Sequence, residues 1–400
     1  MKILQVHNKY KYTGGEWTVL HQEKNLLQKD HDVEQFIVDN SRELRSAINQ
    51  IKLIASAHYR KSSKKAVSAR IKKENFDMMH VHNFFPLLTP SVFEAAREQG
   101  VPSVLSLHNF RLIHPNGLLY HNGKIDERSV KGNAWKCVLD GVYRNSILQT
   151  AVVAHMIEYH RKHGTWQKFP SAFIALSEFS KSKFVEGGLP DERIFVKPNF
   201  IQDPLNEFPD LNIKKPKEEF YIYIGRISGE KGIGELINYW LKQGAGSKLV
   251  IAGDGPLKQK LQKKTMGRKD IEWKGHLDKK EILELLSSAK ALLFPTKCYE
   301  NFPITILEAM SVGCPVITSN IGNPAKIIEH GKTGFHFELD QPEDLTKQMN
   351  KLGNEDTSKT LSRNARRTYL EKYTPKINYD ILMVIYEKAD ELEKRLISEN

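Results

Sequence analysis

Patterns typical of β-strands and α-helices alternate along most of the 400 residues of this chain. Short apolar runs such as Lys2–His7 and Phe220–Ile224 are followed by amphipathic segments such as Thr18–Gln28 and Gly232–Leu241. Because parallel strands are joined by crossover helices, the alternation predicts parallel sheets built from βαβ units. We therefore expect an α/β protein with Rossmann-like, doubly wound sheets.

The length predicts more than one domain, since 400 residues exceed a single small core. Two alternating series are separated by the polar, proline-bearing stretch 198–216. We predict an N-terminal domain over residues 1–200, a C-terminal domain over residues 201–375 and a last helix over residues 376–400. Residues 109–144 are polar, hold four glycines and lack periodicity, which indicates a long functional loop or a short hairpin rather than core.

The cysteines and the hydropathy pattern indicate a cytoplasmic protein. Cys137, Cys298 and Cys314 are odd in number and widely spaced, which argues against a disulfide framework. The first residues are expected to form a strand, not a signal peptide. No run approaches the 18 or so apolar residues of a membrane-spanning helix.

The net charge of +12 lies mostly in the first 200 residues, which carry +10. Seven basic residues crowd between Arg60 and Lys73 without an acidic one. Such a cluster is suited to anionic lipid headgroups or phosphorylated substrates, and a peripheral position on the inner membrane face would follow. A solvated helix face is the equally simple alternative.

Two carboxylates, Glu300 and Glu308, have seven residues between them. The first is predicted in the loop after the strand Ala291–Phe294, and the second about two turns into the next helix. Open parallel sheets bind ligands at this edge. A hydrolytic pair of the glycosidase type is the competing interpretation. It is disfavoured because two helical turns place the carboxylates roughly 10 Å or more apart.

Glycine-rich turns after other strands are candidate anion sites. The turn Gly225–Gly232 carries Arg226 and Lys231, which suit a diphosphate, although a solvated turn is the alternative. It lacks the spacing of a P-loop, and no Gly-x-Gly-x-x-Gly follows a first strand, so no dinucleotide cofactor is expected. Gly14-Gly15 could offer backbone amides to an anion or form only a tight turn. The segment 252–256 is interpreted mainly as a turn.

Histidines gather near predicted strand ends. His108 ends the strand Pro102–Leu107, where a general base or a substrate contact is plausible, although a packing histidine is the simpler interpretation. His114, His121 and Cys137 lack any recognised metal-ligand spacing. We therefore expect no metal and no cofactor.

Together these motifs resemble the retaining GT-B glycosyltransferases of glycosyltransferase family 4. The resemblance runs in order through Gly14-Gly15, His108, Gly225–Gly232, residues 252–256 and the Glu300–Glu308 run. It implies a GT-B fold, with two Rossmann-like domains facing a central cleft and the last helix crossing back to the first domain.

The resemblance also implies a role for each residue. Glu308 would bind the nucleotide ribose, Arg226 and Lys231 would neutralise the diphosphate, and Glu300 and His108 would contact the donor sugar. Gly225 would let the backbone approach the donor, and Gly14 and Gly15 would let the first domain close over its phosphates. Asn301, Phe302 and Pro303 would offer amides near the sugar and phosphate.

The expected activity is the metal-independent transfer of a hexosyl-type sugar, with retention, from a nucleoside-diphosphate sugar such as a UDP- or GDP-sugar. The expected acceptor is a glycan or a lipid-pyrophosphate-linked sugar, in surface polysaccharide biosynthesis. A nucleotide-sugar epimerase of the same fold stays open, and so, more remotely, does a nucleic-acid-binding protein. No nucleic acid partner is expected.

Overall fold

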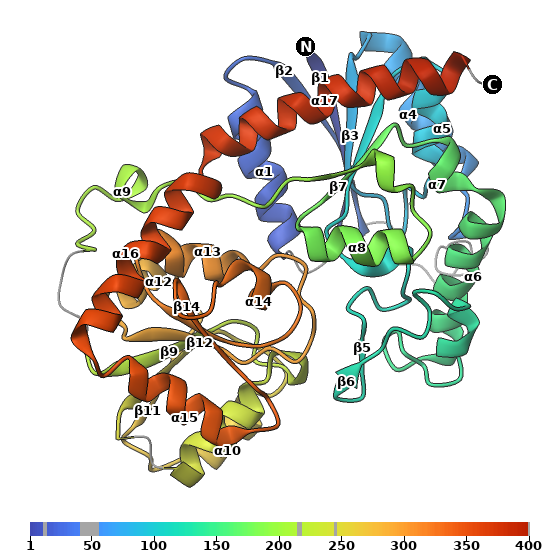
Figure 1. Cartoon of the computed structure of the whole chain (residues 1–400). Helices are drawn as coiled ribbons and strands as arrows, with labels where there is room; N and C mark the ends of the chain where they lie inside the picture. Colours follow the sequence, from blue (N-terminus) through green and yellow to red (C-terminus); the bar gives the residue numbers. More distant parts are fainter. Residues whose placement is uncertain (11–13, 41–55, 214–217, 244–245, 399–400) are drawn as a thin grey trace. The chain divides into compact units, whose positions relative to one another are not determined.

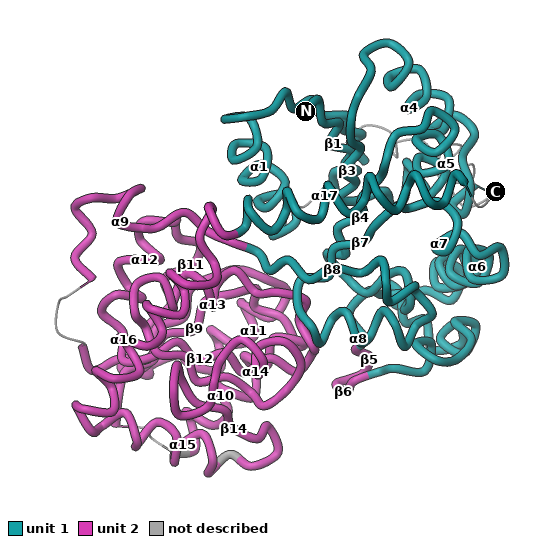
Figure 2. Tube along the Cα trace, turned by 45° about the horizontal axis from the view of Figure 1, so that its top comes forward, with its two compact units in different colours: residues 1–119, 126–199, 378–400 teal, residues 120–125, 200–377 magenta. Residues whose placement is uncertain are grey.

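The computed structural model describes residues 1–10, 14–40, 56–213, 218–243 and 246–398. The chain forms two compact units (Figure 2). Unit 1 comprises Met1–Leu119, Asp126–Asn199 and Asn378–Asn400. Unit 2 comprises Tyr120–Ile125 and Phe200–Ile377. Each unit is described below by itself.

Unit 1 contains a six-stranded, all-parallel sheet in the order β2-β1-β3-β4-β7-β8 (Figure 1). Its strands are β1 (Lys2–Lys9), β2 (Asp32–Asp39), β3 (Met78–Asn83), β4 (Ser103–Ser106), β7 (Ala172–Ala175) and β8 (Ile194–Val196). Its helices include α1 (Gly15–Leu27), α4 (Lys61–Glu74), α5 (Ser91–Arg97), α6 (Ile147–His163), α7 (Thr165–Lys168) and α8 (Glu178–Glu186).

Unit 2 repeats this plan with a parallel sheet in the order β11-β10-β9-β12-β13-β14. Its strands are β9 (Phe220–Ile224), β10 (Lys248–Ala252), β11 (Ile271–Gly275), β12 (Ala291–Phe294), β13 (Val316–Ser319) and β14 (Gly334–Phe337). Its helices are α9 (Pro204–Glu207), α10 (Ile233–Gln243), α11 (Lys258–Lys264), α12 (Lys279–Ser288), α13 (Ile304–Ser311), α14 (Pro324–Ile327), α15 (Pro342–Lys351) and α16 (Glu355–Lys372).

The predicted α/β class is confirmed, because strands and helices alternate through both units. The central strands β9 and β12 are buried along their whole length, as expected of parallel strands with both faces covered. Helix α8 is one of the helices that the sequence prediction did not name. It begins at a Ser177 cap, whose side chain accepts a hydrogen bond from the N–H of Ser180.

In both sheets the strand order reverses direction at one place. In unit 1 the reversal lies between β1 and β3, and in unit 2 between β9 and β12. Open α/β sheets bind ligands outside the carboxyl ends of the two strands at such a switch point. The loops after these four strands are therefore the parts of each unit to examine for a site.

The loop between β4 and α6 contains a hairpin and two 3₁₀ turns. The hairpin pairs β5 (Tyr120–His121) with β6 (Lys124–Ile125), and the turns are η1 (Phe110–Leu112) and η2 (Ala134–Cys137). The predicted short hairpin is confirmed. The prediction that this stretch contributes no core is wrong, since Phe110, Ile113, Leu119 and Cys137 among others are buried. Because its backbone is irregular, its buried apolar residues follow neither the helical nor the strand period that would reveal them in the sequence.

The final helix, α17 (Pro375–Ser398), packs on the sheet of unit 1 from Asn378 onwards (Figure 1). The side chain of Asn378 donates to the carbonyl of Pro198 at 2.6 Å. The hydroxyl of Tyr386 lies 2.8 Å from Nδ1 of His80 in β3. The carboxylate of Glu393 accepts a hydrogen bond from Ser171 at 2.7 Å and pairs with Arg97.

The basic cluster of the sequence forms α4 and the residue before it. Three of its seven cations have partners within unit 1: Lys64 pairs with Glu94 and Glu98, Arg70 pairs with Glu34 and Glu74, and Arg60 donates to the carbonyl of Leu87. The other four, Lys61, Lys65, Lys72 and Lys73, are exposed. Within the described residues, no helix is long and apolar enough to cross a membrane.

Candidate functional site

The loops after β9 and β12 touch backbone to backbone at the switch point of unit 2. Gly232 has φ of 70°, and a Cβ built on it would lie 1.8 Å from the carbonyl oxygen of Pro295. Only glycine has room at this contact. The N–H of Lys297 donates to the carbonyl of Glu230 at 2.8 Å. The two loops therefore hold each other in place.

This contact brings Lys231 and Glu300 together. The ammonium of Lys231 lies 2.5 Å from Oε1 of Glu300, and the hydroxyl of Thr296 donates to the same oxygen at 3.1 Å. Burial by itself lowers the pKa of Lys231, but the Glu300 carboxylate more than offsets it, so the pKa lies above its usual value. Lys231 is therefore a fixed cation at the carboxyl edge of the sheet.

The backbone around Glu300 is held in an uncommon conformation. Glu300 has φ of 48°, a left-handed value that is rare outside glycine. The buried side chain of Asn323 donates to the carbonyl of Glu300 at 2.8 Å and to that of Asn301 at 2.5 Å. Its own N–H donates to Tyr299 at 3.0 Å. Asn323 thus positions the Glu300 loop.

Asn323 is not among the residues predicted from the sequence, although the turn in which it lies is visible there. Gly322-Asn323-Pro324 follows the strand β13, as the other candidate turns follow theirs. Gly322 lies so close to the loop that a Cβ on it would be 2.4 Å from the carbonyl oxygen of Tyr299.

Glu308 lies on α13, on the same chain segment as Glu300 but in a different environment. Its side chain is half-buried, and burial raises the pKa of Glu308 to about 7. The described part of the chain offers its carboxylate no ion pair or hydrogen bond.

Phe302 and Pro303 lead into the same helix. Pro303 occupies the N-cap position of α13. The centre of the buried Phe302 ring lies 5.9 Å from that of the Tyr373 ring. Asn301 is half-buried. These residues fix the start of α13 beside Glu300.

Arg226 is exposed and has no ion-pair partner among the residues that the structure describes. The backbone of this turn is held by a side chain of β9: the hydroxyl of Tyr223 donates to the carbonyl of Arg226 at 2.8 Å. The predicted turn 252–256 packs against it: a Cβ on Gly253 would lie 1.9 Å from the carbonyl oxygen of Gly225. A positioned backbone with a free guanidinium suits an anionic ligand.

In unit 1, Gly14 and Gly15 lie at the amino end of α1, after β1. Both are exposed, and a Cβ on either would meet nothing within 4 Å. Packing inside the described unit therefore does not require glycine here. Next to them, burial raises the pKa of Glu16 to about 7.

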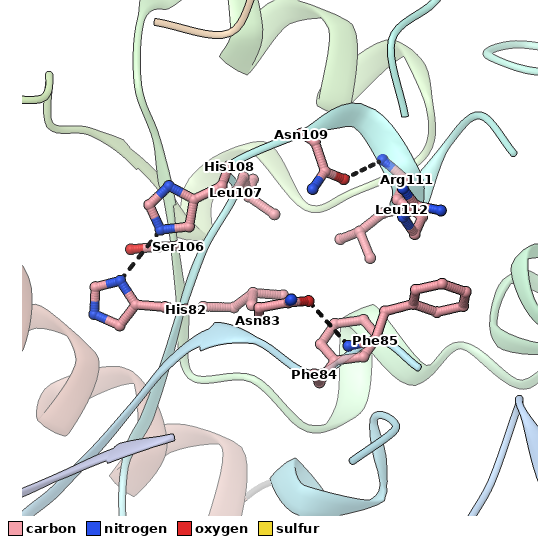
Figure 3. Close-up of a pocket in the computed structure, with 11 residues that line it drawn as sticks. His82, Asn83, Phe84, Phe85, Ser106, Leu107, His108, Asn109, Arg111 and Leu112 are labelled. Atoms are coloured by element: carbon pink, nitrogen blue, oxygen red, sulfur yellow. Dashed lines mark hydrogen bonds between the residues drawn. The ribbon is translucent and has the colours of Figure 1, made fainter. Parts of the chain in front are cut away.

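His108 lies at the end of β4, beside His82 of β3. Their facing ring nitrogens, Nε2 of His108 and Nδ1 of His82, are 3.2 Å apart (Figure 3). Burial, reinforced by His82, holds the pKa of His108 well below its usual value, so the ring is neutral at physiological pH. It can donate or accept one hydrogen bond at each nitrogen, but it cannot act as a cation.

A small pocket opens at this strand end, and Figure 3 shows Arg111 on its wall with His82, His108 and Asn109. The Arg111 guanidinium carbon lies 4.6 Å from the centre of the Phe85 ring and 5.0 Å from that of Tyr143. Sequence reasoning missed Arg111 as a candidate. Nothing in its local sequence pattern distinguishes it from an exposed arginine.

The candidate residues thus form two groups. Lys231, Glu300 and the residues around Arg226 and Glu308 belong to unit 2, whereas His108, Gly14 and Gly15 belong to unit 1. Each group lies at the carboxyl ends of strands at, or next to, the switch point of its own sheet.

Comparisons with known proteins agree for both units. The family model described as Glycosyltransferase Family 4 matches residues 12–203, and that of Glycosyl transferases group 1 matches residues 206–368. A lipopolysaccharide 1,6-galactosyltransferase of Escherichia coli is 31% identical over 200 residues, which are 46% of this chain and 52% of that protein. A sulfoquinovosyl transferase of Arabidopsis thaliana is 30% identical over 166 residues, 41% of this chain and 32% of that protein. The chain therefore matches about half or less of the length of these curated relatives.

Solved structures resemble the chain over its whole length. A glycosyltransferase of Rickettsia africae has a TM-score of 0.66 at 16% identity, and the superposition covers 100% of this chain and 100% of that one. The Anabaena protein HepE, crystallised with UDP, has a TM-score of 0.65 at 17% identity, covering 97% of this chain and 100% of that one. At these identities the likeness concerns the fold.

The raised pKa of Glu308 predicts a pH-dependent stability. Between its ordinary value of 4.5 and about 7, the folded protein binds a proton there that the unfolded chain has lost. Stability therefore falls as pH rises through this window and levels off above it. Glu308→Gln should raise the melting temperature at pH 8 by about 2–4 °C, the shift for about 1 kcal/mol in a unit of this size, and change it little at about pH 4.5.

The matched control is Glu343→Gln, which changes an exposed glutamate on α15. It should leave the melting temperature unchanged at both pH values. Thermal unfolding of both variants across this range is the measurement. If Glu308→Gln changed the melting temperature equally at pH 8 and at about pH 4.5, the raised pKa of the Glu308 carboxyl would be contradicted.

Proposed function

We propose that this chain, which belongs to the group 1 glycosyl transferases of glycosyltransferase family 4, transfers a hexosyl-type sugar from a nucleoside-diphosphate sugar to a glycan or lipid-linked acceptor. The GT-B fold implied by the sequence resemblance is confirmed by the structural neighbours. The matches to both family models support the glycosyltransferase activity. The donor, the stereochemistry and the acceptor are the proposed parts.

The observation that carries the proposal is the pairing of Lys231 with Glu300 across the two loops at the switch point of unit 2. Cleavage of a sugar–phosphate bond develops negative charge on the leaving diphosphate and positive charge on the anomeric carbon. A positioned cation beside a positioned carboxylate matches this distribution. Stabilising groups that are already oriented act most strongly on a transition state.

In the proposed mechanism, Lys231 and the unpaired Arg226 bind the diphosphate as it leaves. This role needs no metal ion, so we propose metal-independent transfer. Retention is proposed to arise from attack on the face from which the diphosphate departs. The acceptor oxygen bonds to the anomeric carbon, the sugar–phosphate bond breaks, and the acceptor proton passes to the phosphate. No protein nucleophile takes part.

The remaining residues are proposed as donor contacts. The unpaired Glu308 carboxylate accepts hydrogen bonds from the ribose hydroxyls, which also favour its ionised form. Glu300 and the neutral His108 contact the donor sugar. Gly14, Gly15, Gly225 and residues 301–303 place backbone near the phosphates and the sugar. The UDP in the HepE crystal structure supports a nucleotide donor by fold analogy.

Surface polysaccharide biosynthesis is the proposed pathway, supported by the Escherichia coli relative, which is a lipopolysaccharide galactosyltransferase. The excess positive charge of the first 200 residues favours an anionic or lipid-pyrophosphate-linked acceptor. The exposed lysines of α4 are the proposed contact with an anionic membrane surface.

A thermal-shift screen tests the function directly. Added UDP, GDP, ADP and their sugars are the ligands, and one nucleotide series should stabilise the protein. A ligand at about 100 times its dissociation constant adds about 2.7 kcal/mol. Glu308→Ala should weaken that shift. No stabilisation by any nucleotide would refute the proposal, and conversion of the donor to an epimer without an acceptor would indicate an epimerase instead.

Removing the cations of the β9–α10 turn should slow the chemical step. Arg226→Ala and Lys231→Ala should each lower kcat by about 10²–10³-fold with a smaller effect on KM, because the charge that they bind grows in the transition state. Lys260→Ala, at an exposed lysine on α11, is the control and should keep full activity. The measurement is steady-state kinetics with saturating acceptor. If both variants turned over as fast as the wild type, the leaving-group role of Arg226 and Lys231 would be excluded.

The membrane contact has its own test. Replacement of Lys61, Lys65, Lys72 and Lys73 by glutamine should abolish sedimentation with vesicles that contain anionic lipid, since each lysine near such a surface contributes about 1 kcal/mol. Vesicles of neutral lipid should bind neither the wild type nor the variant with four glutamines. Equal binding of the wild type to both kinds of vesicle would disprove the contact.

A further inference from the structure

Three buried side chains of different chemistry meet inside the loop between β4 and α6. His114 follows η1, Asp126 follows β6 and Cys137 ends η2. One imidazole nitrogen, one carboxylate oxygen and the thiol sulfur all lie within 4.8 Å of one another. All three residues are buried and belong to unit 1. None has a role in the proposed transfer.

The hydrogen bonds of His114 show which of its nitrogens is free to bind a cation. Its Nδ1 lies 2.8 Å from Oδ1 of Asn116, and the same oxygen accepts from the N–H of Leu118 at 2.9 Å. Because a backbone N–H only donates, the shared atom is the amide oxygen, and Nδ1 of His114 carries the proton. In the neutral ring, Nε2 then presents a lone pair to Asp126 and Cys137. Metal-binding histidines are oriented in this way by a partner at the other nitrogen.

The spacing of the three atoms fits metal ligands better than hydrogen-bond partners. Nε2 of His114 lies 3.5 Å from Oδ2 of Asp126 and 3.9 Å from Sγ of Cys137. A charge-assisted hydrogen bond between imidazolium and carboxylate would be about 2.7–2.9 Å long. Around one tetrahedral Zn²⁺, nitrogen and oxygen ligands lie about 3.3–3.5 Å apart and nitrogen and sulfur about 3.6 Å apart. The two distances from Nε2 depart from these values by a few tenths of an ångström at most, and the third pair, Asp126 with Cys137, lies within 4.8 Å.

The surroundings keep the carboxylate charged and balance the site. Arg128 donates to both oxygens of Asp126, at 2.9 and 2.8 Å, and is itself paired with Asp140. A thiolate and one carboxylate would neutralise a divalent ion, while Asp140 neutralises Arg128. The hydroxyl of the buried Ser129 donates to the carbonyl of Ile113 at 2.8 Å, which leaves its oxygen lone pairs beside the cluster.

We propose that His114, Asp126 and Cys137 bind one Zn²⁺ ion, with a water molecule as the fourth ligand. On binding, a zinc–sulfur bond replaces the S–H bond of Cys137, and the proton leaves to solvent. The ion joins three points of a loop that has little regular structure, so its role is to hold that loop in shape. The loop begins directly after His108. The site is independent of the proposed transferase function and does not take part in its chemistry.

A second buried cluster, Glu23 with His80 and His82, has a similar spacing of possible ligand atoms but a different set of neighbours. There the ammonium of Lys197 lies 2.9 Å from the Glu23 carboxylate. Both nitrogens of His80 have hydroxyl partners at 2.8 Å, Tyr386 and Ser106. The His114 cluster also holds a protein cation, because Arg128 donates to both oxygens of Asp126, but no hydroxyl partner of His114 Nε2 is recorded among the described residues.

The full-length protein, expressed without a metal-binding tag, is the sample for the test. After dialysis against metal-free buffer, mass spectrometry of the metal content should find about one zinc ion per chain. Exchange for Co²⁺ should give the thiolate-to-cobalt charge-transfer band and the intense visible bands of a tetrahedral site. Cys137→Ala should lose the charge-transfer band, and Asp126→Asn should weaken metal binding at least tenfold. Cys314→Ala, at a buried cysteine of unit 2, should change neither.

Wild-type protein that holds no zinc and gives no cobalt band would overturn the proposal, whatever the variants do. A charge-transfer band that survives in Cys137→Ala would place the metal elsewhere and would also overturn it. Circular dichroism identifies variants that fail to fold, and the wild-type spectrum does not depend on them. The nucleotide screen reports on unit 2 separately, so failure of one proposal leaves the other intact.

Discussion

The close contact between the loops after β9 and β12 is the constraint on which the candidate site depends. The carbonyl of Pro295 occupies the space that a Cβ of Gly232 would need, so the two loops meet at backbone distance. The neighbour of that glycine is Lys231, and Glu300 follows Pro295 by one short turn. The contact therefore sets the separation of the two charges, and Asn323 fixes the strained backbone of Glu300 from the far side.

Unit 1 depends in a similar way on how its buried charges are matched. Glu23 is fully buried but faces Lys197 and two histidines, and Asn378 and Tyr386 of α17 complete this network. Buried charges are tolerated when they are paired and hydrogen-bonded. In the cluster of His114, Asp126 and Cys137, the tautomer set by Asn116 turns the Nε2 lone pair of His114 toward a carboxylate oxygen 3.5 Å away. These two facing acceptor atoms are the physical basis for proposing an ion at this cluster.

Sequence reasoning found most strands and helices because their signals are local. The strands Phe220–Ile224 and Ala291–Phe294 were predicted with the bounds that the structure has, and so was the position of Glu300 after a strand. Asn323 and Arg111 were missed because their roles arise from contacts with distant residues. The loop 109–144 was misjudged because irregular backbone can bury side chains without periodicity. Cys137 was considered with His114 and His121, whereas the structure places it with His114 and Asp126.

The sequence by itself determined the α/β class, the strand-end loops that hold the candidate residues and the types of side chain that those loops offer. These are properties of neighbouring residues, and periodicity and residue type reveal them. Only the tertiary structure decided which side chains face each other: Lys231 with Glu300, 69 positions apart, and His80 with Tyr386, 306 apart. It also decided which charges find no partner among the described residues, as at Arg226 and Glu308. Ion pairing and burial depend on distance through space, and the order of residues along the chain does not contain that distance.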